Sequence, residues 1–357
     1  MKCIRFDYEE KYIKDFLKLP KKLYNKTNKT EVSSEVREIL LDRHMLLKYV
    51  KELYKFVVYD DDNKIAGRFV ITTVKNERVA YLGFFECVYN RRIAQFLFKK
   101  ATQFVKEKGY DSIIGPVDIN MWFKYRLKVD RFEIPPYTGE PYNREYYYKM
   151  FLDNGFVIKD TYHTHTYTKF GEDFNISKFK KRYDYFIKKG YEIRNIREDE
   201  WESAIVQVYE LIMKLYSNFA TFVKLDKEDF IKQFDNYKKI LDMNFVTMAY
   251  YKEKIVGFSI SIPNYGNAVY NLSNPMNLFK IIKTKKGAKE YLITYMGVDP
   301  KHPGLARALT YVTIGELRKK DAECMGVLIK EGKLTNNFVD ATLKFSYEYV
   351  LMEKTIK

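Results

Sequence analysis

The sequence predicts an α/β protein in which one mixed-sheet fold occurs twice in tandem. Three observations lead to this prediction. Helical and strand periods of apolar residues alternate in the same order in both halves of the chain. The length of 357 residues is enough for two domains with separate cores. In the second half, an apolar strand runs through a turn of small residues directly into an amphipathic helix.

The first half, residues 1–170, is the expected N-terminal domain. Gly109 marks the end of a helix, because glycine readily adopts the left-handed conformation found after helices. Asp60 to Asn63 form the turn between two strands. The predicted strands lie at residues 3–6, 55–59, 65–74, 79–88, 112–115 and 156–168, and the predicted helices lie at 8–18, 35–50, 91–108 and 144–153.

The second half, residues 191–357, repeats this order of elements and is the expected C-terminal domain. Residues 171–190, rich in Lys and aromatic residues, form the connector and are expected to be helical in part. Both halves read strand, two helices, three strands, helix, strand, helix, strand. The predicted strands of the second half lie at 191–196, 244–251, 254–262, 290–298, 324–330 and 347–355, and its helices lie at 199–217, 226–240, 305–320 and 336–344.

The segment 291–310 has the architecture of a phosphate-binding loop. A helix start leaves backbone N–H groups without partners and carries the positive end of the helix dipole. A pyrophosphate can therefore bind there if no large side chain blocks it. Gly304, Ala306 and Ala308 keep the approach open.

This spacing resembles the acyl-CoA loop of the GCN5-related N-acetyltransferases, the GNAT superfamily, whose signature is Val-x-Pro, two residues, then Gln/Arg-x-x-Gly-x-Gly/Ala. Val298 and Pro300 are in register, and Pro303 takes the Gln/Arg place. Ala306 takes the place of the first Gly, and Ala308 takes the Gly/Ala place. The order of elements in each half is also that of the acetyltransferase fold. We therefore expect two tandem acyl-CoA N-acyltransferase (GNAT) folds.

The resemblance implies an N-acetyltransferase that uses acetyl-CoA as cosubstrate and acylates an amine acceptor. The central strand of the fold would hold the thioester and the pantetheine amides, and the loop and helix start would hold the phosphates. The residues expected to bind the acyl-CoA are Met296, Gly297, Val298, Pro303, Gly304, Leu305, Ala306, Arg307, Ala308, Asn336 and Asn337.

Candidate catalytic residues follow from the same mechanism. The amine must lose a proton before it attacks, so a carboxylate or a water relay on the central strand is required. Glu290 and Thr294 share a strand face with Met296, and Glu290 is the carboxylate among them. The family's tyrosine acid would fall at Thr342, so the nearby Tyr347 is the candidate that protonates the thiolate. His163 and His165 lie on one strand face without further ligands nearby, and no metal is expected.

The first half lacks an open loop at the corresponding place. Glu86 to Ile93 contains no glycine between the strand and the helix. Bulky side chains would keep a pyrophosphate from the backbone, although Arg91 and Arg92 could bind phosphate directly. We expect a degenerate N-terminal domain whose aromatic insertion, residues 117–140, could instead cover an acceptor pocket.

Composition narrows the setting but leaves alternatives. The net charge of +16 suits anionic partners such as CoA, acidic substrates or tRNA, although biased base composition also explains it. Because tandem layouts also resemble Fem-type peptidyltransferases and N-myristoyltransferases, a Fem-like aminoacyl-tRNA-dependent transferase and a catalytically inactive acyl-CoA-binding protein remain alternatives. The sequence has no apolar run of about 18 residues and no signal peptide, which predicts a cytoplasmic protein without a membrane partner. The short basic clusters 99–100 and 180–182 are expected on solvated faces.

Overall fold

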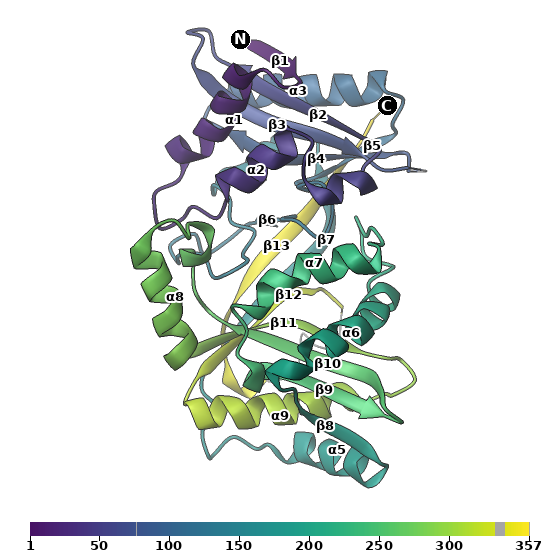
Figure 1. Cartoon of the computed structure of the whole chain (residues 1–357). Coiled ribbons are helices and arrows are strands. Elements are labelled where there is room, and N and C mark those ends of the chain that lie inside the picture. The colour runs from purple at the N-terminus through teal and green to yellow at the C-terminus, as the bar shows by residue number, and fades with distance from the viewer. Residues whose placement is uncertain (76, 333–339, 357) are drawn as a thin grey trace. The chain divides into compact units, whose positions relative to one another are not determined.

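The computed structural model describes residues 1–75, 77–332 and 340–356, and it divides the chain into two compact units (Figure 1). The first unit contains Met1–Tyr162 together with Tyr347–Lys357. The second unit contains His163–Ser346. The last strand of the chain is therefore shared, because its beginning belongs to the second unit and its remainder to the first.

The first unit is built around a sheet in the order β1-β2-β3-β4-β5-β13. Neighbouring strands are antiparallel except β4 and β5, which are parallel. Helices α1 and α2 pack on one apolar cluster that includes Phe16 and Val70, and α3 and α4 pack on another that includes Leu97 and Phe151. The elements are β1 (Lys2–Phe6), α1 (Glu10–Leu23), α2 (Ser33–Leu40), β2 (Glu52–Tyr59), β3 (Ile65–Thr73), β4 (Val79–Cys87), α3 (Arg91–Glu107), β5 (Ser112–Gly115), β6 (Leu127–Lys128), α4 (Tyr147–Asp153) and β13 (Leu343–Thr355).

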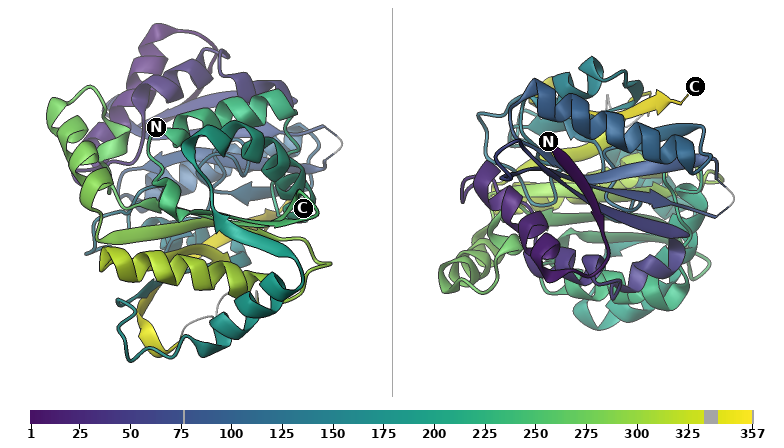
Figure 2. Two further views of the ribbon diagram at one scale, coloured as in Figure 1. Left: turned by 60° about the horizontal axis from the view of Figure 1, so that its bottom comes forward. Right: turned by 90° about the horizontal axis from the view of Figure 1, so that it is seen from above.

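The second unit has a sheet in the order β7-β12-β11-β10-β9-β8. Helices α5 and α9 lie side by side on one face of this sheet, joined by an apolar cluster that includes Phe186 and Leu305 (Figure 2). Helices α6 and α7 lie against its other face (Figure 1). The elements are β7 (Val157–Tyr167), α5 (Ser177–Lys188), β8 (Tyr191–Asn195), α6 (Trp201–Leu215), α7 (Lys227–Lys238), β9 (Val246–Tyr251), β10 (Lys254–Pro263), α8 (Pro275–Gly287), β11 (Glu290–Val298), α9 (Leu305–Lys320) and β12 (Glu323–Lys330).

The two halves of the sequence exchange their final strands. The strand beside β5 in the first unit is β13, which pairs antiparallel from Met352 opposite Gly115 to Thr355 opposite Ser112. The strand beside β12 in the second unit is β7, from the first half of the sequence, and the Leu328 N–H donates to Thr164 Oγ1 at 3.0 Å. Each sheet is therefore completed by a strand from the other half of the chain.

Most predicted elements are present, and the differences have local causes. The predicted helix 35–50 ends at Leu40, where Asp42 adopts a left-handed φ of 56° and the Leu40 carbonyl accepts from the Lys55 ammonium. A short 3-10 turn, Met45–Tyr49, follows. The predicted helix 336–344 lies largely outside the described residues, and from Leu343 the chain is already in β13. Helix α8 had no counterpart among the predicted elements.

Candidate functional site

The central strand of the second unit, β11, is bulged and leaves its parallel neighbour halfway along. It pairs with β12 from Glu290, opposite Glu323, to Ile293, and no further pairing of these strands occurs among the described residues. On its other side, Ile260 pairs with Tyr295 while Ser261 pairs with Ile293. Thr294 is therefore an extra residue, a β-bulge. The backbone of 294–298 can offer its polar groups to a ligand on the side that β12 has left.

The turn between β11 and α9 has a defined conformation, fixed by one glycine and several hydrogen bonds. Gly304 precedes the helix with a left-handed φ of 88°, which glycine adopts without strain. The Asp299 carboxylate accepts from the Lys301 N–H at 3.0 Å and from the Lys214 ammonium at 2.9 Å. The His302 ring is 2.6 Å from the Tyr191 hydroxyl. Within the first turn of α9, the Leu305 N–H donates to the His302 carbonyl and the Arg307 N–H donates to the Gly304 carbonyl, both at 3.2 Å. The helix start is therefore held in place, with the positive end of its dipole at the turn.

The first turn of α9 presents small or exposed side chains on one side and anchors on the other. Leu305 and Ala308 are fully buried in the cluster with Phe186 of α5. Ala306 is half-buried, and Arg307 is exposed. Of the predicted contacts, Leu305 and Ala308 can therefore serve only through their backbone, because their side chains belong to the core.

A guanidinium lies beside this helix start. A methyl group built on Gly304 would lie 3.3 Å from both Cζ and Nε of Arg182, on the neighbouring helix α5. An Arg side chain binds phosphate through paired N–H donors. Arg182 thus offers a cation near the loop, whereas the loop itself has Pro303 at the Gln/Arg position of the motif. Arg182 is exposed, as its place in the basic cluster 180–182 predicts, and it also lies next to the loop.

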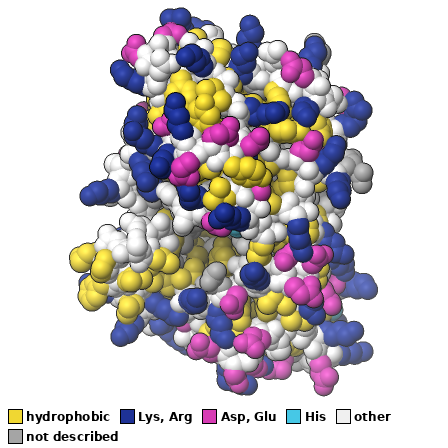
Figure 3. Space-filling model, turned by 45° about the horizontal axis from the view of Figure 1, so that its top comes forward, with side chains coloured by type: hydrophobic (Ala, Val, Ile, Leu, Met, Phe, Trp, Pro, Cys, Tyr) yellow, Lys and Arg dark blue, Asp and Glu magenta, His cyan; other side chains and the backbone are white. Residues whose placement is uncertain are grey.

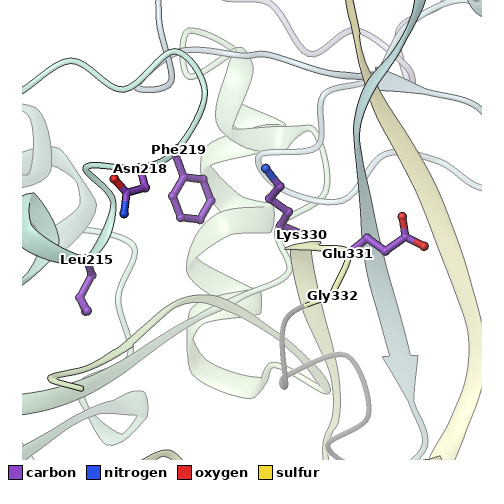
Figure 4. A pocket seen from close by; sticks show the side chains of 6 residues that line it. All are labelled: Leu215, Asn218, Phe219, Lys330, Glu331 and Gly332. Carbon is purple, nitrogen blue, oxygen red and sulfur yellow. The ribbon is translucent and has the colours of Figure 1, made fainter. Parts of the chain in front are cut away.

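A cavity of about 340 Å³ lies near the open segment of β11 and shares the residue Leu215 with its surroundings. Its lining comes from the end of α6 with the loop that follows, and from the end of β12. Leu215 connects it with β11, because a methyl group built on Gly297 would lie 2.7 Å from Leu215 Cδ1. In Figure 4 the Lys330 side chain extends toward the side of Phe219, whereas the Glu331 carboxylate points away from it. The lining residues are Leu215, Asn218, Phe219, Lys330, Glu331 and Gly332.

Nine of the predicted acyl-CoA contacts lie in β11, in the turn after it or at the start of α9, whereas Glu290 and Tyr347 lie apart from them. Met296, Gly297 and Val298 lie in the open segment and lead to residues 303–308. Asn336 and Asn337 lie outside the described residues.

Glu290 lies in the closed part of β11, three residues before the strands part, which is roughly 10 Å along the strand. Its carboxylate accepts from the Asn264 side chain. The Thr294 hydroxyl donates to the Ile260 carbonyl at 3.0 Å. Tyr347 belongs to the first unit, where it is buried with the Lys128 ammonium 4.6 Å from its ring centroid. The roles of all three remain predictions.

The first unit has the same opening, but its own chain fills it. Strand β4 pairs with β5 only from Val79 to Tyr81, and its register against β3 shifts just beyond Gly83, which faces Val70. A methyl group built on Gly83 would lie 2.0 Å from the Val117 carbonyl oxygen. The Val117 N–H donates to the Leu82 carbonyl at 2.9 Å, and the Asp118 carboxylate accepts from the Phe84 N–H. Residues 117–118 thus occupy the space that a ligand would take.

The helix start of the first unit is likewise closed by its own side chain. Asn90 Oδ1 accepts from the N–H groups of Arg92 and Ile93 at 3.0 and 3.2 Å. Just before it, the buried Glu86 carboxylate accepts from Tyr147 at 2.6 Å and from Tyr24 at 3.0 Å. Burial raises the pKa of Glu86, although the nearby Arg68 guanidinium opposes the shift. This environment holds a structural network at the place where the second unit has its open loop.

Two further properties of the site's surroundings come from the described residues. Among them, no helix combines the length and apolar character needed to cross a bilayer. Nor do they contain a group of three or more His, Cys, Asp or Glu side chains placed to hold a metal ion. His163 and His165 stack with ring centroids 5.8 Å apart, and His165 Nδ1 lies 2.7 Å from Ser346 Oγ.

Comparison with known proteins identifies the fold. No family model matches the chain. It is 21% identical over 317 residues to Protein YghO of Escherichia coli (strain K12), covering 82% of this chain and 80% of YghO. A tandem GNAT protein from the clavulanic acid biosynthesis pathway is similar in structure with a TM-score of 0.53 and 12% identity, covering 100% of this chain and 98% of that one. A GCN5-related N-acetyltransferase from Kribbella flavida gives a TM-score of 0.51 at 9% identity, covering 99% and 72%.

These similarities confirm the predicted fold class: the chain has a tandem GNAT-like fold. At these identities the comparisons concern the fold. The substrates must be argued from the site itself.

Proposed function

We propose that the protein is an acyl-CoA-dependent N-acyltransferase, with acetyl-CoA as the simplest cosubstrate and an amine as acceptor. The observation that supports this most is the continuous path in the second unit. It runs from the open, bulged segment of β11 through the turn at Gly304 to the start of α9, with Arg182 beside it.

Each part of this path suits one part of an acyl-CoA. The first-turn amides of α9 and the Arg182 guanidinium would bind the pyrophosphate. The backbone of 296–298 would hydrogen-bond the pantetheine amides, in place of the lost β12 partner. The cavity that borders Gly297 through Leu215 would hold the acyl group and the acceptor.

The reaction needs a proton acceptor and a proton donor. The amine nitrogen attacks the thioester carbonyl, the C–S bond breaks, the amine loses one proton, and the thiolate gains one. Glu331 lines the cavity, but its carboxylate points away from the side of Phe219, so Glu290 stays the candidate base. Thr294 and Tyr347 remain candidates for the relay and the acid, to be compared by single substitutions.

The test measures binding first and chemistry second. Isothermal titration calorimetry with acetyl-CoA, longer acyl-CoAs and free CoA should show a single site, and saturating ligand should raise the melting temperature by mass action. Release of free CoA thiol in the presence of a panel of amines then reports transfer. Unchanged melting curves with every acyl-CoA would refute the ligand assignment. Binding without transfer to any amine would favour the inactive acyl-CoA-binding alternative.

The Fem-like alternative is separated by salt dependence. A tRNA ligand engages many backbone phosphates, so its affinity falls by roughly three orders of magnitude or more when salt rises fourfold and six or more contacts form. We expect weak tRNA binding that disappears at physiological salt, reflecting the net charge of +16. Submicromolar tRNA binding that persists at physiological salt, together with no acyl-CoA binding, would replace our proposal.

A further inference from the structure

Helix α8 exposes apolar side chains that the fold does not use. It lies between β10 and β11, antiparallel neighbours that a short turn could join. Met276, Phe279 and Ile282 are 72%, 66% and 57% exposed. Leu272, just before the helix, and Leu278 are exposed as well. Figure 3 shows hydrophobic side chains gathered on the protruding region at the left, where α8 lies in Figure 1.

The helix is partly covered on its opposite side and is hydrogen-bonded at both ends. Ile281 and Thr284 are half-buried. Asn274 caps the N-terminus by accepting from the Met276 N–H at 3.0 Å, and the Lys285 ammonium donates to the Lys239 carbonyl at 2.9 Å. The helix that exposes the apolar side chains is therefore capped at its N-terminus and bonded to the second unit near its C-terminus.

The charged residues of helix α8 itself are all lysines. Helix α8 carries Lys280, Lys283, Lys285 and Lys286, and Lys289 follows it. Residues 254–289 contain no Asp or Glu. A helix that combines exposed Phe, Met, Ile and Leu with several lysines suits the boundary between the headgroups and acyl chains of an anionic bilayer. Nucleic acid would use the lysines, but it would leave Met276 and Ile282 in water.

We propose that α8 is a peripheral docking element for an anionic phospholipid surface. Its apolar face, formed by Met276, Leu278, Phe279 and Ile282, enters the headgroup boundary, and its lysines pair with lipid phosphates. This inference does not depend on the acyl-CoA proposal. The helix lies on the membrane and does not cross it.

The test is cosedimentation of the full chain with vesicles. Vesicles of phosphatidylcholine alone are compared with an equal mixture of phosphatidylcholine and phosphatidylglycerol, at low and physiological salt. We expect binding to the mixed vesicles, weaker binding at higher salt and little binding to phosphatidylcholine alone. The double variant Phe279→Ser/Ile282→Ser should weaken partitioning by about tenfold or more, because two apolar side chains no longer enter the boundary.

Charge variants and matched controls complete the experiment. Replacing Lys280, Lys283 and Lys286 by Gln should weaken partitioning by roughly fivefold for each lysine. The control with the same charge change replaces three exposed lysines of the first unit by Gln and should bind almost as well as the parent protein. A second control, Tyr89→Ser/Val157→Ser, removes exposed apolar side chains elsewhere. The three control lysines are Lys18, Lys99 and Lys100.

The outcomes separate this inference from the alternatives. All variants should keep their melting temperatures without lipid, because the replaced side chains are exposed, and all should keep their acyl-CoA affinity. Equal binding by α8 variants and controls, or no binding to mixed vesicles, overturns the proposal. The proposal is also overturned if the protein does not bind vesicles but α8 is required for tRNA binding. The same holds if α8 is required for self-association in ultracentrifugation and vesicles are not bound. If the parent protein binds no acyl-CoA, only the proposed function is refuted.

Discussion

The two units contain the same opening between a central strand and its parallel neighbour, and they use it differently. In both, the central strand carries a bulge and pairs with its neighbour over a few residues only. In the first unit, β5 ends at Gly115 and residues 117–118 turn back into the opening. In the second, β12 continues to Lys330 and a cavity borders the opening. The path of the chain after the shorter strand therefore decides whether the opening can receive a ligand.

The starts of α3 and α9 also differ between the two units. The first-turn amides of α3 are satisfied by the Asn90 side chain. Gly304 has no side chain that could cap α9. Side-chain capping stabilises a helix by about 1 kcal/mol. At the start of α9, backbone carbonyls take this place for two amides, since Leu305 N–H donates to His302 and Arg307 N–H donates to Gly304. The first unit therefore has a side-chain cap at the place where the second unit has a glycine.

The largest effect is expected where the first unit's opening is filled. Gly83→Ala places a methyl group 2.0 Å from the Val117 carbonyl oxygen, which is backbone and cannot rotate away. We expect the free energy of unfolding to fall by roughly 2 to 3 kcal/mol, the upper end of overpacking costs. Urea denaturation followed by circular dichroism measures it. A neutral Gly83→Ala would mean that residues 117–118 do not fill this space.

The matched control is Gly315→Ala in the interior of α9. Nothing lies within 4 Å of a methyl group at this position. Alanine is the better helix former by about 1 kcal/mol, so this variant should be more stable than the parent protein. Opposite signs for the same chemical change would establish that Gly83 is required by its surroundings.

The second prediction compares the two helix starts as ligand sites. Ala306→Glu adds bulk and negative charge at the second position of α9, and acetyl-CoA affinity should fall by roughly ten- to hundredfold. Arg92→Glu makes the corresponding change in α3 and should leave that affinity unchanged, because Asn90 already closes the site. Titration calorimetry on both variants decides. A loss with Arg92→Glu and not with Ala306→Glu would place the nucleotide in the first unit.

The third prediction concerns the guanidinium beside Gly304. Arg182→Ala should weaken acetyl-CoA binding by about fivefold to tenfold, since hydrogen bonds to charged groups contribute about 1.5 to 3 kcal/mol and exposure reduces this. Arg182→Lys keeps the charge without the paired donors and should give an intermediate affinity. Lys181→Ala, an equally exposed neighbour, is the control. Equal affinities for the two alanine variants would remove Arg182 from the site.

Local signals explain what the sequence could predict. The strand, turn and helix around Gly304 are contiguous, so periodicity and small residues identified them, and the repeated order of elements led to the tandem fold. Periodicity does not say which sheet a strand joins. The exchange of β7 and β13, and with it the place of Tyr347 in the first unit, therefore could not be predicted.

Contacts between distant residues explain most of the rest. Arg182 reaches Gly304 only because α5 packs on α9, and the basic cluster around it has the composition of any solvated helix face. Helix α8 was missed for a different reason. Its apolar residues face outward, so it lacks the buried stripe that helix prediction relies on. Val117 fills the opening of the first unit because of a turn that no local sequence pattern predicts.

The smallest expected effect is a difference between the two units in how stability depends on pH. Two glutamates, one in each unit, have pKa values shifted in opposite directions. Burial raises the pKa of Glu86. Hydrogen bonds from the Arg194 guanidinium lower the pKa of Glu200 to about 2. A carboxyl group in the unfolded chain titrates near about 4.3, so the folded state binds more protons than the unfolded state at Glu86 and fewer at Glu200.

These shifts give opposite slopes of stability against pH. The contribution of Glu86 is fully present below the unfolded pKa and is lost as pH rises through its raised folded pKa, so Glu86→Gln should remove a decline of stability above about pH 4.3. The contribution of Glu200 is present above the unfolded pKa and is lost as pH falls toward 2, so Glu200→Gln should remove a rise of stability between about pH 2 and pH 4.3. Urea denaturation at several pH values, comparing each variant with the parent protein, measures both differences. If the curves of unfolding free energy against pH are parallel for Glu86→Gln and the parent protein, burial does not favour the protonated Glu86 carboxyl. If they are parallel for Glu200→Gln and the parent protein, solvent screening cancels the effect of Arg194 on Glu200.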